Sequence, residues 1–270
     1  MNNTDFNTIV FTSFSKKNFY LRSYISSFVL NNSCVPVSPF MNFDYNMTWL
    51  VNKDFIRISN NTLIKKSNEL WVFWELSDWV VIEIYLAKKY KKIVRYFMVA
   101  SNWIDFEETN ENKVILEDVS PWMWEWILSW KNLERWHPRL RFKKEYSLVY
   151  PAYSKHNFYL HMHISKFCLE NKKIPLNPFM LFKYFLWDKI SRESVYKANA
   201  TIVNMCDELW TFWPVSDWVL DEIKQKKNEK PKSVKYFKIA NTSPQVNFRK
   251  VLPSSVEFEE EELEQFRNCL

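Results

Sequence analysis

The stretch Glu69–Ile84 reads ELWVFWELSDWVVIEI, and it returns at Glu208–Ile223 as ELWTFWPVSDWVLDEI. Each copy opens with a short apolar run that is typical of a buried strand. A Ser-Asp pair follows, which suits the start of a helix, and the run after it is apolar at helical spacing. A strand that leads directly into a helix is the building unit of an α/β fold. The chain therefore contains this unit twice.

The duplication covers most of the chain. Residues 18–83 align without a gap with residues 157–222, and 27 of these 66 positions are identical. Both copies show the same alternation of expected strands and helices, which predicts a parallel sheet with helices on both faces. We expect the ELWVF segment to be the central strand because it is the most apolar. The chain is thus predicted to be α/β with two domains, residues 1–116 and 144–270, and a Trp-rich linker at 117–143. The second domain ends in an acidic tail.

Charge and cysteine content limit the classes of function. The net charge of +6 is mild for 270 residues, and the basic residues fall in short runs rather than one stripe, so nucleic acid is not favoured as a partner. The first residues lack the features of a secretory signal, no apolar run is long enough to span a bilayer, and the four Cys show no disulfide-like spacing. We therefore expect a cytoplasmic protein. His161 and His163 have no further ligands nearby and are interpreted as helix surface, so no metal and no other cofactor is expected.

The chain contains no glycine and 14 tryptophans. At an average frequency of about 7%, roughly 19 glycines would be expected in a chain of this length. Several tryptophans stand where glycine is common: Trp74 and Trp213 follow a predicted strand, whereas Trp79 and Trp218 follow the Asp at a helix start. One explanation is that UGA codons, which some bacterial lineages read as Gly, were translated as Trp. The alternative is a protein genuinely rich in Trp and free of Gly, and UGG codons at these four positions would establish it.

Read with glycine at those four positions, the copies become ELWVFGELSDGVVIEI and ELWTFGPVSDGVLDEI. With VPVSPF and IPLNPF upstream and VRYF and VKYF downstream, they resemble the nucleoside 2-deoxyribosyltransferase-like superfamily, and in particular its small uncharacterised bacterial and phage members. The resemblance covers nearly all of each repeat, but neither the linker nor the tail. It implies two tandem flavodoxin-like domains. It also implies cleavage or transfer of the N-glycosidic bond of a nucleoside or nucleotide.

The resemblance assigns roles to acidic residues. A Glu four residues after the helix-start Gly is the nucleophile of these enzymes, and it corresponds to Glu83 and Glu222. An Asp near the start of the preceding helix assists; its nearest match is Asp54, whose counterpart in the second copy is Glu193. Two features depart from the family pattern. Ser replaces the acidic residue before the Asp-Gly pair, and the family's aromatic residue on the first strand has no clear match.

The chemistry explains why these residue types matter. A carboxylate beneath the anomeric carbon can stabilise the oxocarbenium-like centre of glycosidic cleavage or bond to it, and a second acid can protonate the departing base. Free N–H groups at a helix start favour a hydroxyl or phosphate of the ligand. The candidate substrate-binding residues are therefore Ser77, Asp78, Trp79, Ser216, Asp217, Trp218, Asn60 and Asn199.

The same residues have structural interpretations. Asp78 and Asp217 suit helix capping, and the two Asn could be packing residues. Glu222 could pair with Lys226 one turn later, whereas Glu83 shares its helix face with apolar residues, which indicates partial burial and makes it the stronger candidate. Another recurring set of aromatic residues fits a core better than a base-stacking surface: Phe40, Phe43, Tyr45, Phe179, Phe182 and Tyr184.

Two functions of different classes follow. The first is an enzyme acting on the N-glycosidic bond of a nucleoside or nucleotide. The second is a non-catalytic protein of the same fold that binds a nucleotide-like ligand or a partner protein. The position of Glu83 and Asp54 discriminates between them, because an enzyme needs both in one pocket. An internal pseudo-dimer of the two repeats, or a homo-oligomer, is expected.

Overall fold

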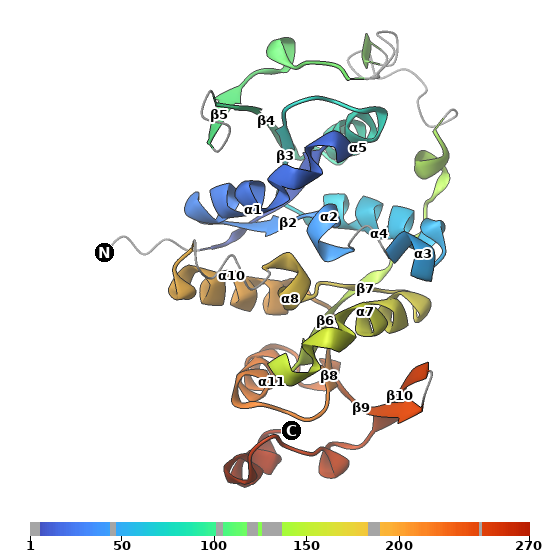
Figure 1. Ribbon diagram of the computed structural model, residues 1–270, viewed down its shortest axis with the longest axis vertical. Helices are drawn as coiled ribbons and strands as arrows, with labels where there is room; N and C mark the ends of the chain where they lie inside the picture. The colour runs from blue at the N-terminus through green and yellow to red at the C-terminus, as the bar shows by residue number, and fades with distance from the viewer. Residues whose placement is uncertain are drawn as a thin grey trace.

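The computed structural model describes residues 6–43, 47–100, 105–117, 124–125, 137–182, 190–242 and 245–270. These residues form two α/β units, each built on a five-stranded, mostly parallel sheet flanked by helices (Figure 1). We call the unit that ends at residue 117 repeat 1 and the unit that starts at residue 144 repeat 2.

The strands and the main helices follow the same order in both repeats. Those of repeat 1 are β1 (Thr8–Phe14), the 3-10 helix η1 (Lys16–Leu21), α1 (Arg22–Asn31), β2 (Cys34–Val37), α2 (Pro39–Asn42), α3 (Met47–Leu50), α4 (Lys53–Lys66), β3 (Glu69–Phe73), α5 (Asp78–Lys89), β4 (Ile93–Val99), β5 (Phe106–Thr109) and η2 (Glu111–Lys113). Those that follow are η4 (Pro138–Arg141), β6 (Ser147–Tyr153), η5 (Lys155–Leu160), α7 (His161–Glu170), β7 (Lys173–Pro175), α8 (Pro178–Leu181), α10 (Arg192–Met205), β8 (Glu208–Phe212), α11 (Asp217–Glu229), η6 (Pro231–Ser233), β9 (Val234–Thr242), β10 (Gln245–Val251), η7 (Pro253–Ser255) and η8 (Glu261–Cys269).

The predicted central strand is central in both sheets. The strand order is β2-β1-β3-β4-β5 in repeat 1 and β10-β9-β8-β6-β7 in repeat 2. Val10 pairs with Glu69 and Val149 with Glu208, so the register between first and central strands is the same in both copies. The sequence analysis did not anticipate the antiparallel strands, β5 and β10, which close one edge of each sheet.

The central strand is buried on both faces, as a near-continuous apolar run requires. Leu70 and Val72 belong to the apolar cluster that includes residues of α4 and α5. Trp71 and Phe73 point to the opposite face and pack in a second cluster with residues of α1. Side chains of a strand alternate between faces, so this one segment anchors helices on both sides of the sheet.

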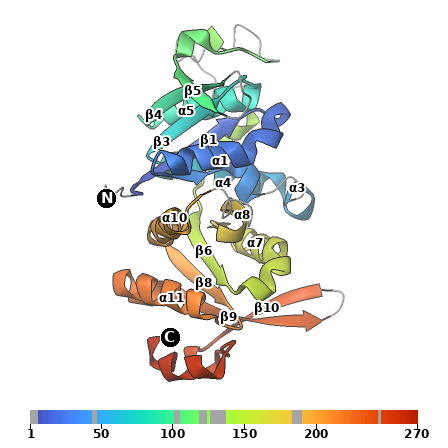
Figure 2. The same ribbon diagram turned by 60° about the vertical axis from the view of Figure 1, so that its left-hand side comes forward.

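The two repeats share an interface. Helix α2 packs on its own counterpart α8, and α1 packs on α10. The Nδ2 of Asn42 donates to the carbonyl of Pro175 at 2.7 Å, and the Thr201 hydroxyl donates to the carbonyl of Phe6 at 2.8 Å. Figures 1 and 2 both show α8 and α10 between the two sheets. The apolar cluster around α4 and α5 continues into repeat 2, so the repeats pack as one body.

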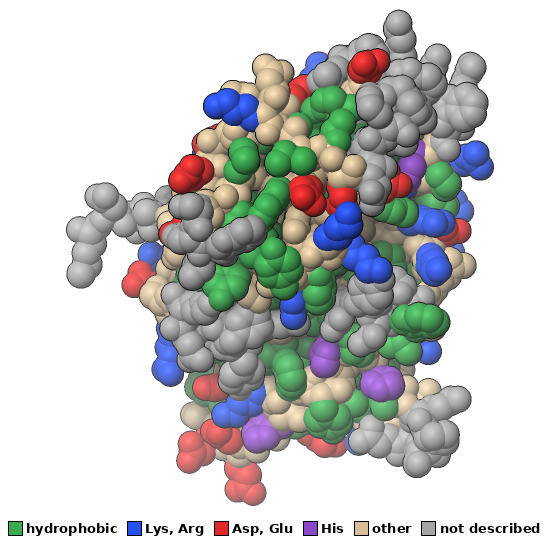
Figure 3. All heavy atoms as spheres, turned by 45° about the horizontal axis from the view of Figure 1, so that its top comes forward, with side chains coloured by type: hydrophobic (Ala, Val, Ile, Leu, Met, Phe, Trp, Pro, Cys, Tyr) green, Lys and Arg blue, Asp and Glu red, His purple; other side chains and the backbone are tan. Residues whose placement is uncertain are grey.

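The described end of the linker contacts repeat 1 and contributes one buried side chain. Helix η4 packs against α4, and its Arg139 is only 1% exposed. The linker therefore does more than bridge the repeats. Most of the predicted linker, residues 118–123 and 126–136, lies outside the described residues. No helix within the described ranges is long and apolar enough to cross a membrane. Figure 3 shows acidic and basic side chains interspersed on one face, without a single basic patch among the coloured residues.

Candidate functional site

Repeat 2 contains a cavity of about 530 Å³ beside the carboxyl ends of β6 and β8. Ligands of parallel α/β sheets bind at this edge. Residues from the loop after β6, from α8, α10 and α11, and from the C-terminal tail line the cavity: Tyr153, Lys155, His156, Pro178, Phe179, Phe182, Arg192, Val195, Asn199, Ser216, Asp217, Trp218, Glu222, Glu259 and Glu260. Five of the residues that the sequence proposed are in this set: Asn199, Ser216, Asp217, Trp218 and Glu222.

Glu222 is a buried carboxylate on the wall of the cavity. It is 6% exposed and lies in the second turn of α11. Asn199 Nδ2 donates to its Oε1 at 3.0 Å, Trp218 Nε1 donates to the same oxygen at 2.7 Å, and the Tyr150 hydroxyl also bonds to it. Burial raises the pKa of Glu222 to about 7, although these three donors favour the ionised form and oppose the rise. Near neutral pH the side chain therefore exists as both acid and carboxylate.

Tyr150 was missed in the sequence. Its hydroxyl also lies 2.9 Å from Oδ1 of Asn199, so its single proton is shared between two acceptors. Burial, and then the charge of Glu222, raise the pKa of Tyr150 well above its ordinary value, so it remains protonated. Tyr150 is on β6, the first strand of repeat 2, where the sequence analysis found no match for the family's aromatic residue. The available signal was that an aromatic residue occupies this position in both copies, as Phe11 in repeat 1 and Tyr150 in repeat 2.

The start of α11 forms one rim of the cavity. Ser216, rather than Asp217, is the N-cap residue, and its hydroxyl accepts from the backbone N–H of Val219 at 3.4 Å. Asp217 is the first helical residue and accepts from the backbone N–H of Trp218 at 2.7 Å. In repeat 1 the cap is likewise Ser77, with Asp78 in the first turn. The Asp residues therefore satisfy a neighbouring N–H and favour the positive end of the helix, but they do not cap it.

In repeat 1 the equivalent site is filled. Nη1 of Arg139 donates to Oε1 of Glu83 at 2.7 Å, and the Ser13 hydroxyl bonds to Oε2. Nε of Arg139 donates to Oδ1 of Asn61 at 2.7 Å, and Nδ2 of Asn61 donates back to the carbonyl of Arg139 at 2.9 Å. The sequence favoured Glu83 over Glu222, but the open cavity is at Glu222. Arg139, which nothing in the repeat comparison could identify, accounts for the difference.

The rest of the polar network also differs between the repeats. Asn199 bonds to Tyr150 and Glu222, whereas Oδ1 of its counterpart Asn60 is buried with no hydrogen-bond partner among the described residues. Phe11 stands where Tyr150 would supply a hydroxyl. Repeat 1 thus has the Asn and Glu of the network but not the tyrosine hydroxyl that donates to both in repeat 2.

The proposed second acids lie apart from the nucleophile candidates. Asp54 is 45% exposed and pairs with Arg57 at 2.8 Å, and Glu83 takes Arg139 instead. Glu193 is 76% exposed, pairs with Lys197 and is not part of the cavity wall. Asp54 and Glu83 thus form ion pairs with different Arg residues.

The C-terminal tail provides carboxylates that the sequence analysis did not consider. Glu259 lines the cavity and accepts from the hydroxyl of Ser154. Its backbone N–H donates to the carbonyl of Val215 at 2.9 Å, which holds the tail against the loop after β8. Glu117 occupies the same place in repeat 1, where it bonds to Ser15. These residues were missed because the alignment of the repeats breaks before the tail.

The aromatic residues divide between core and cavity. Phe43 and Phe182 are 3% and 2% exposed, and Phe40 packs against Phe14. Phe179 and Phe182 also line the cavity, so part of the set has both roles. Tyr45 and Tyr184 lie outside the described residues.

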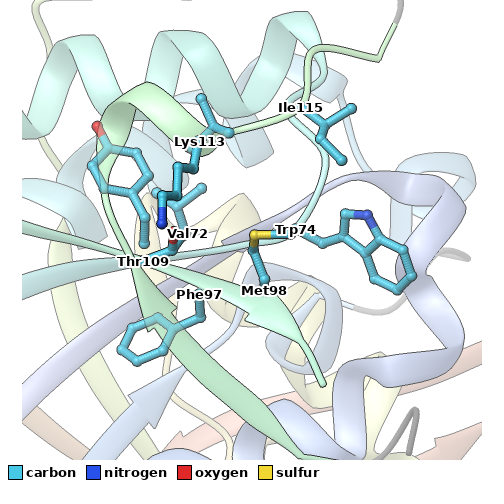
Figure 4. Close-up of a pocket in the computed structure, with 9 residues that line it drawn as sticks. Val72, Trp74, Phe97, Met98, Thr109, Lys113 and Ile115 are labelled. Atoms are coloured by element: carbon cyan, nitrogen blue, oxygen red, sulfur yellow. The ribbon is translucent and has the colours of Figure 1, made fainter. Parts of the chain in front are cut away.

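The tryptophans at glycine-like positions behave differently from one another. Of the four, only Trp74 has a positive φ angle, at φ 59°. Trp79 and Trp218 are 43% and 38% exposed, whereas Trp213 is buried. Figure 4 shows the indole of Trp74 directed away from Val72 and Lys113, beside a hollow too narrow for a water molecule. Trp74 is therefore the position where the backbone itself favours glycine.

No family model, no curated protein and no solved structure matches this chain. Within the described ranges, no three His, Cys, Asp or Glu side chains are grouped as metal ligands. His161 bonds to the carbonyl of Phe158, and His163 is exposed.

Proposed function

We propose that repeat 2 cleaves or transfers the N-glycosidic bond of a nucleoside or nucleotide, with Glu222 as the reacting carboxylate. The observation that carries this proposal is a buried carboxylate, held by three donors, on the wall of a cavity of about 530 Å³. Cavities of roughly 300–1,000 Å³ suit small molecules of this size. The cavity also combines aromatic walls with polar groups, which a base joined to a sugar would need.

The chemistry assigns different tasks to the two oxygens of Glu222. Tyr150, Asn199 and Trp218 hold Oε1, which leaves Oε2 as the oxygen that would approach the anomeric carbon. Its lone pair would form a glycosyl ester as the bond to the base breaks, and water or a second base would then release the sugar. A pKa of about 7 gives a substantial carboxylate fraction at neutral pH and a more basic oxygen than an exposed Glu has.

The departing base requires a proton. Glu193 does not line the cavity, so we assign this task to one of the other carboxyl groups that do: Asp217, Glu259 or Glu260. Phe179 and Trp218 present apolar surface on which the base would stack. The sugar hydroxyls would then meet the polar end of the cavity.

The strand order supports the flavodoxin-like assignment. The order β2-β1-β3-β4-β5 is that of flavodoxin-like sheets, although β5 is antiparallel here. Glycine in place of Trp218 would widen the cavity at the rim where a sugar would approach the backbone. The packing of α2 on its counterpart α8 is the contact that an internal pseudo-dimer would make.

Non-catalytic binding by the same cavity is the second candidate. The exposure of Glu193 favours it, because the acid implied by the resemblance is missing from the site. A screen of free-base release from common nucleosides and deoxynucleotides, with calorimetric binding to the same compounds, separates the two functions. Base release supports the enzyme. Saturable binding without base release supports the binding protein. The absence of both base release and binding would exclude both functions for these compounds.

A further inference from the structure

We propose that the pocket around Glu83 is a guanidinium-binding site, and that the chain's own Arg139 occupies it and closes repeat 1. The inference concerns repeat 1 alone and does not depend on catalysis in repeat 2. In this proposal, the end of the linker supplies Arg139 as a ligand that is covalently part of the same chain. The emptied pocket would accept a small molecule or side chain with a guanidinium group.

The contacts are those of a built site for this group. Arg139 is 1% exposed and Glu83 is 6% exposed. Nη1 meets Oε1 of Glu83 at 2.7 Å, and Nε meets Oδ1 of Asn61 at 2.7 Å. The two acceptors therefore bind two different nitrogens of one planar guanidinium. A Lys ammonium has a single nitrogen and cannot reproduce this arrangement.

The aromatic surroundings favour the same chemistry. The guanidinium carbon of Arg139 lies 5.8 Å from the ring centroid of Trp79, within the range of a cation–π contact. The ring of His137 packs edge-on against the same indole at 5.2 Å. His137 Nδ1 also accepts from the backbone N–H of Arg139 at 3.3 Å. The short helix η4 is thus fixed so that Arg139 enters the pocket.

Sequence differences between the repeats show that this occupant is specific to repeat 1. Asn61, which contacts Arg139 through both its oxygen and its nitrogen, is replaced by Ala200 in repeat 2. Ser13, which bonds to the second oxygen of Glu83, is replaced by Ala152. Repeat 2 therefore lacks the groups that would hold a guanidinium beside Glu222.

The test is chemical rescue of Arg139→Ala. A buried charge left without its partner costs stability, so we expect the melting midpoint to fall by about 6 °C or more. Millimolar methylguanidinium should restore part of this loss in a saturable manner, and calorimetry should detect its binding. Methylammonium should do neither. The full-length protein with Arg139 in place should not bind methylguanidinium. Arg141→Ala, which removes an exposed Arg of the same helix, is the matched control and should leave the midpoint unchanged.

Two further variants keep the test decisive. Glu83→Gln combined with Arg139→Ala should abolish methylguanidinium binding, because it removes the carboxylate. If Arg139→Ala does not fold alone, its recovery as folded protein only when methylguanidinium is present supports the proposal. An unchanged midpoint for Arg139→Ala, no saturable rescue, or equal rescue in the double variant would overturn it.

Discussion

Nε1 of Trp218 donates to Oε1 of Glu222 at 2.7 Å, one turn apart on the same helix. In repeat 1, Arg139 contacts both members of the corresponding pair. Its guanidinium forms an ion pair with Glu83 and also lies over the ring of Trp79. One motif therefore supports an open acid site in repeat 2 and a closed ion pair in repeat 1.

Trp218→Phe should raise the pKa of Glu222 above its value of about 7. The Nε1 donor favours the ionised carboxylate, and its removal disfavours that form, whereas the Phe ring keeps much of the apolar cover. Titration of a ¹³C-labelled Glu222 carboxyl by NMR measures the change. Trp79→Phe is the matched control and should leave the Glu222 titration unaltered. A lower pKa in Trp218→Phe would contradict the assignment of this hydrogen bond.

Glu222→Gln should become progressively more stable than the parent protein as pH rises from about 4.5 to 7. The folded state keeps a proton on Glu222 that the unfolded chain releases in this window, so the parent loses stability as pH increases, and Gln does not. The relative gain should be on the order of 3 kcal/mol, measured by urea denaturation at several pH values. Glu83→Gln should instead be destabilising at neutral pH, because it leaves buried Arg139 unpaired.

Trp74→Gly should be more stable than Trp74→Ala by roughly 1 kcal/mol, since φ of 59° is unfavourable for any residue with a Cβ. Both variants lose the same indole, so the comparison isolates the backbone. The order should reverse at Trp79, which lies in the first turn of α5, where Ala is the better helix former. Thermal denaturation of the four variants measures both differences. Equal stability of the Trp74 pair would argue against a glycine-like position.

Lys226→Met should destabilise repeat 2 by roughly 1–3 kcal/mol. The ammonium is fully buried and donates to the carbonyls of Val203 at 3.0 Å and Cys206 at 2.6 Å, which end α10. Lys226 therefore satisfies a helix C-terminus instead of pairing with Glu222 as the sequence suggested. Chemical denaturation measures the loss. Lys230→Met, at an exposed position, should have little effect.

The sequence was most informative where a pattern repeats. The ELWVF segment identified the central strand of each sheet, because a run of bulky apolar side chains on alternating faces favours a strand that is buried on both sides. The edge strands β5 and β10 were missed because edge positions demand little apolar character, and FEET and QVNFRKV carry many polar residues.

Side-chain networks were less predictable than the fold. The helix carrying Glu222 could be placed, but its partner Tyr150 is 72 residues away in the chain and only the folded sheet brings them together. Arg139 belongs to neither copy of the repeat, so comparison of the repeats could not show that it enters one of them. Glu259 lies in the tail, and the offset that aligns the two copies does not hold there.

The most direct test of the central claim is the rate of base release by Glu222→Gln beside Glu83→Gln, on a nucleoside or nucleotide that the parent protein cleaves. The account predicts that Glu222→Gln loses activity by about 10³-fold or more while it still binds the substrate, because the carboxylate acts on the reacting carbon. Glu83→Gln, provided that it is folded by circular dichroism, should retain base release in repeat 2. Full activity in Glu222→Gln, or loss of activity confined to folded Glu83→Gln, would contradict the account.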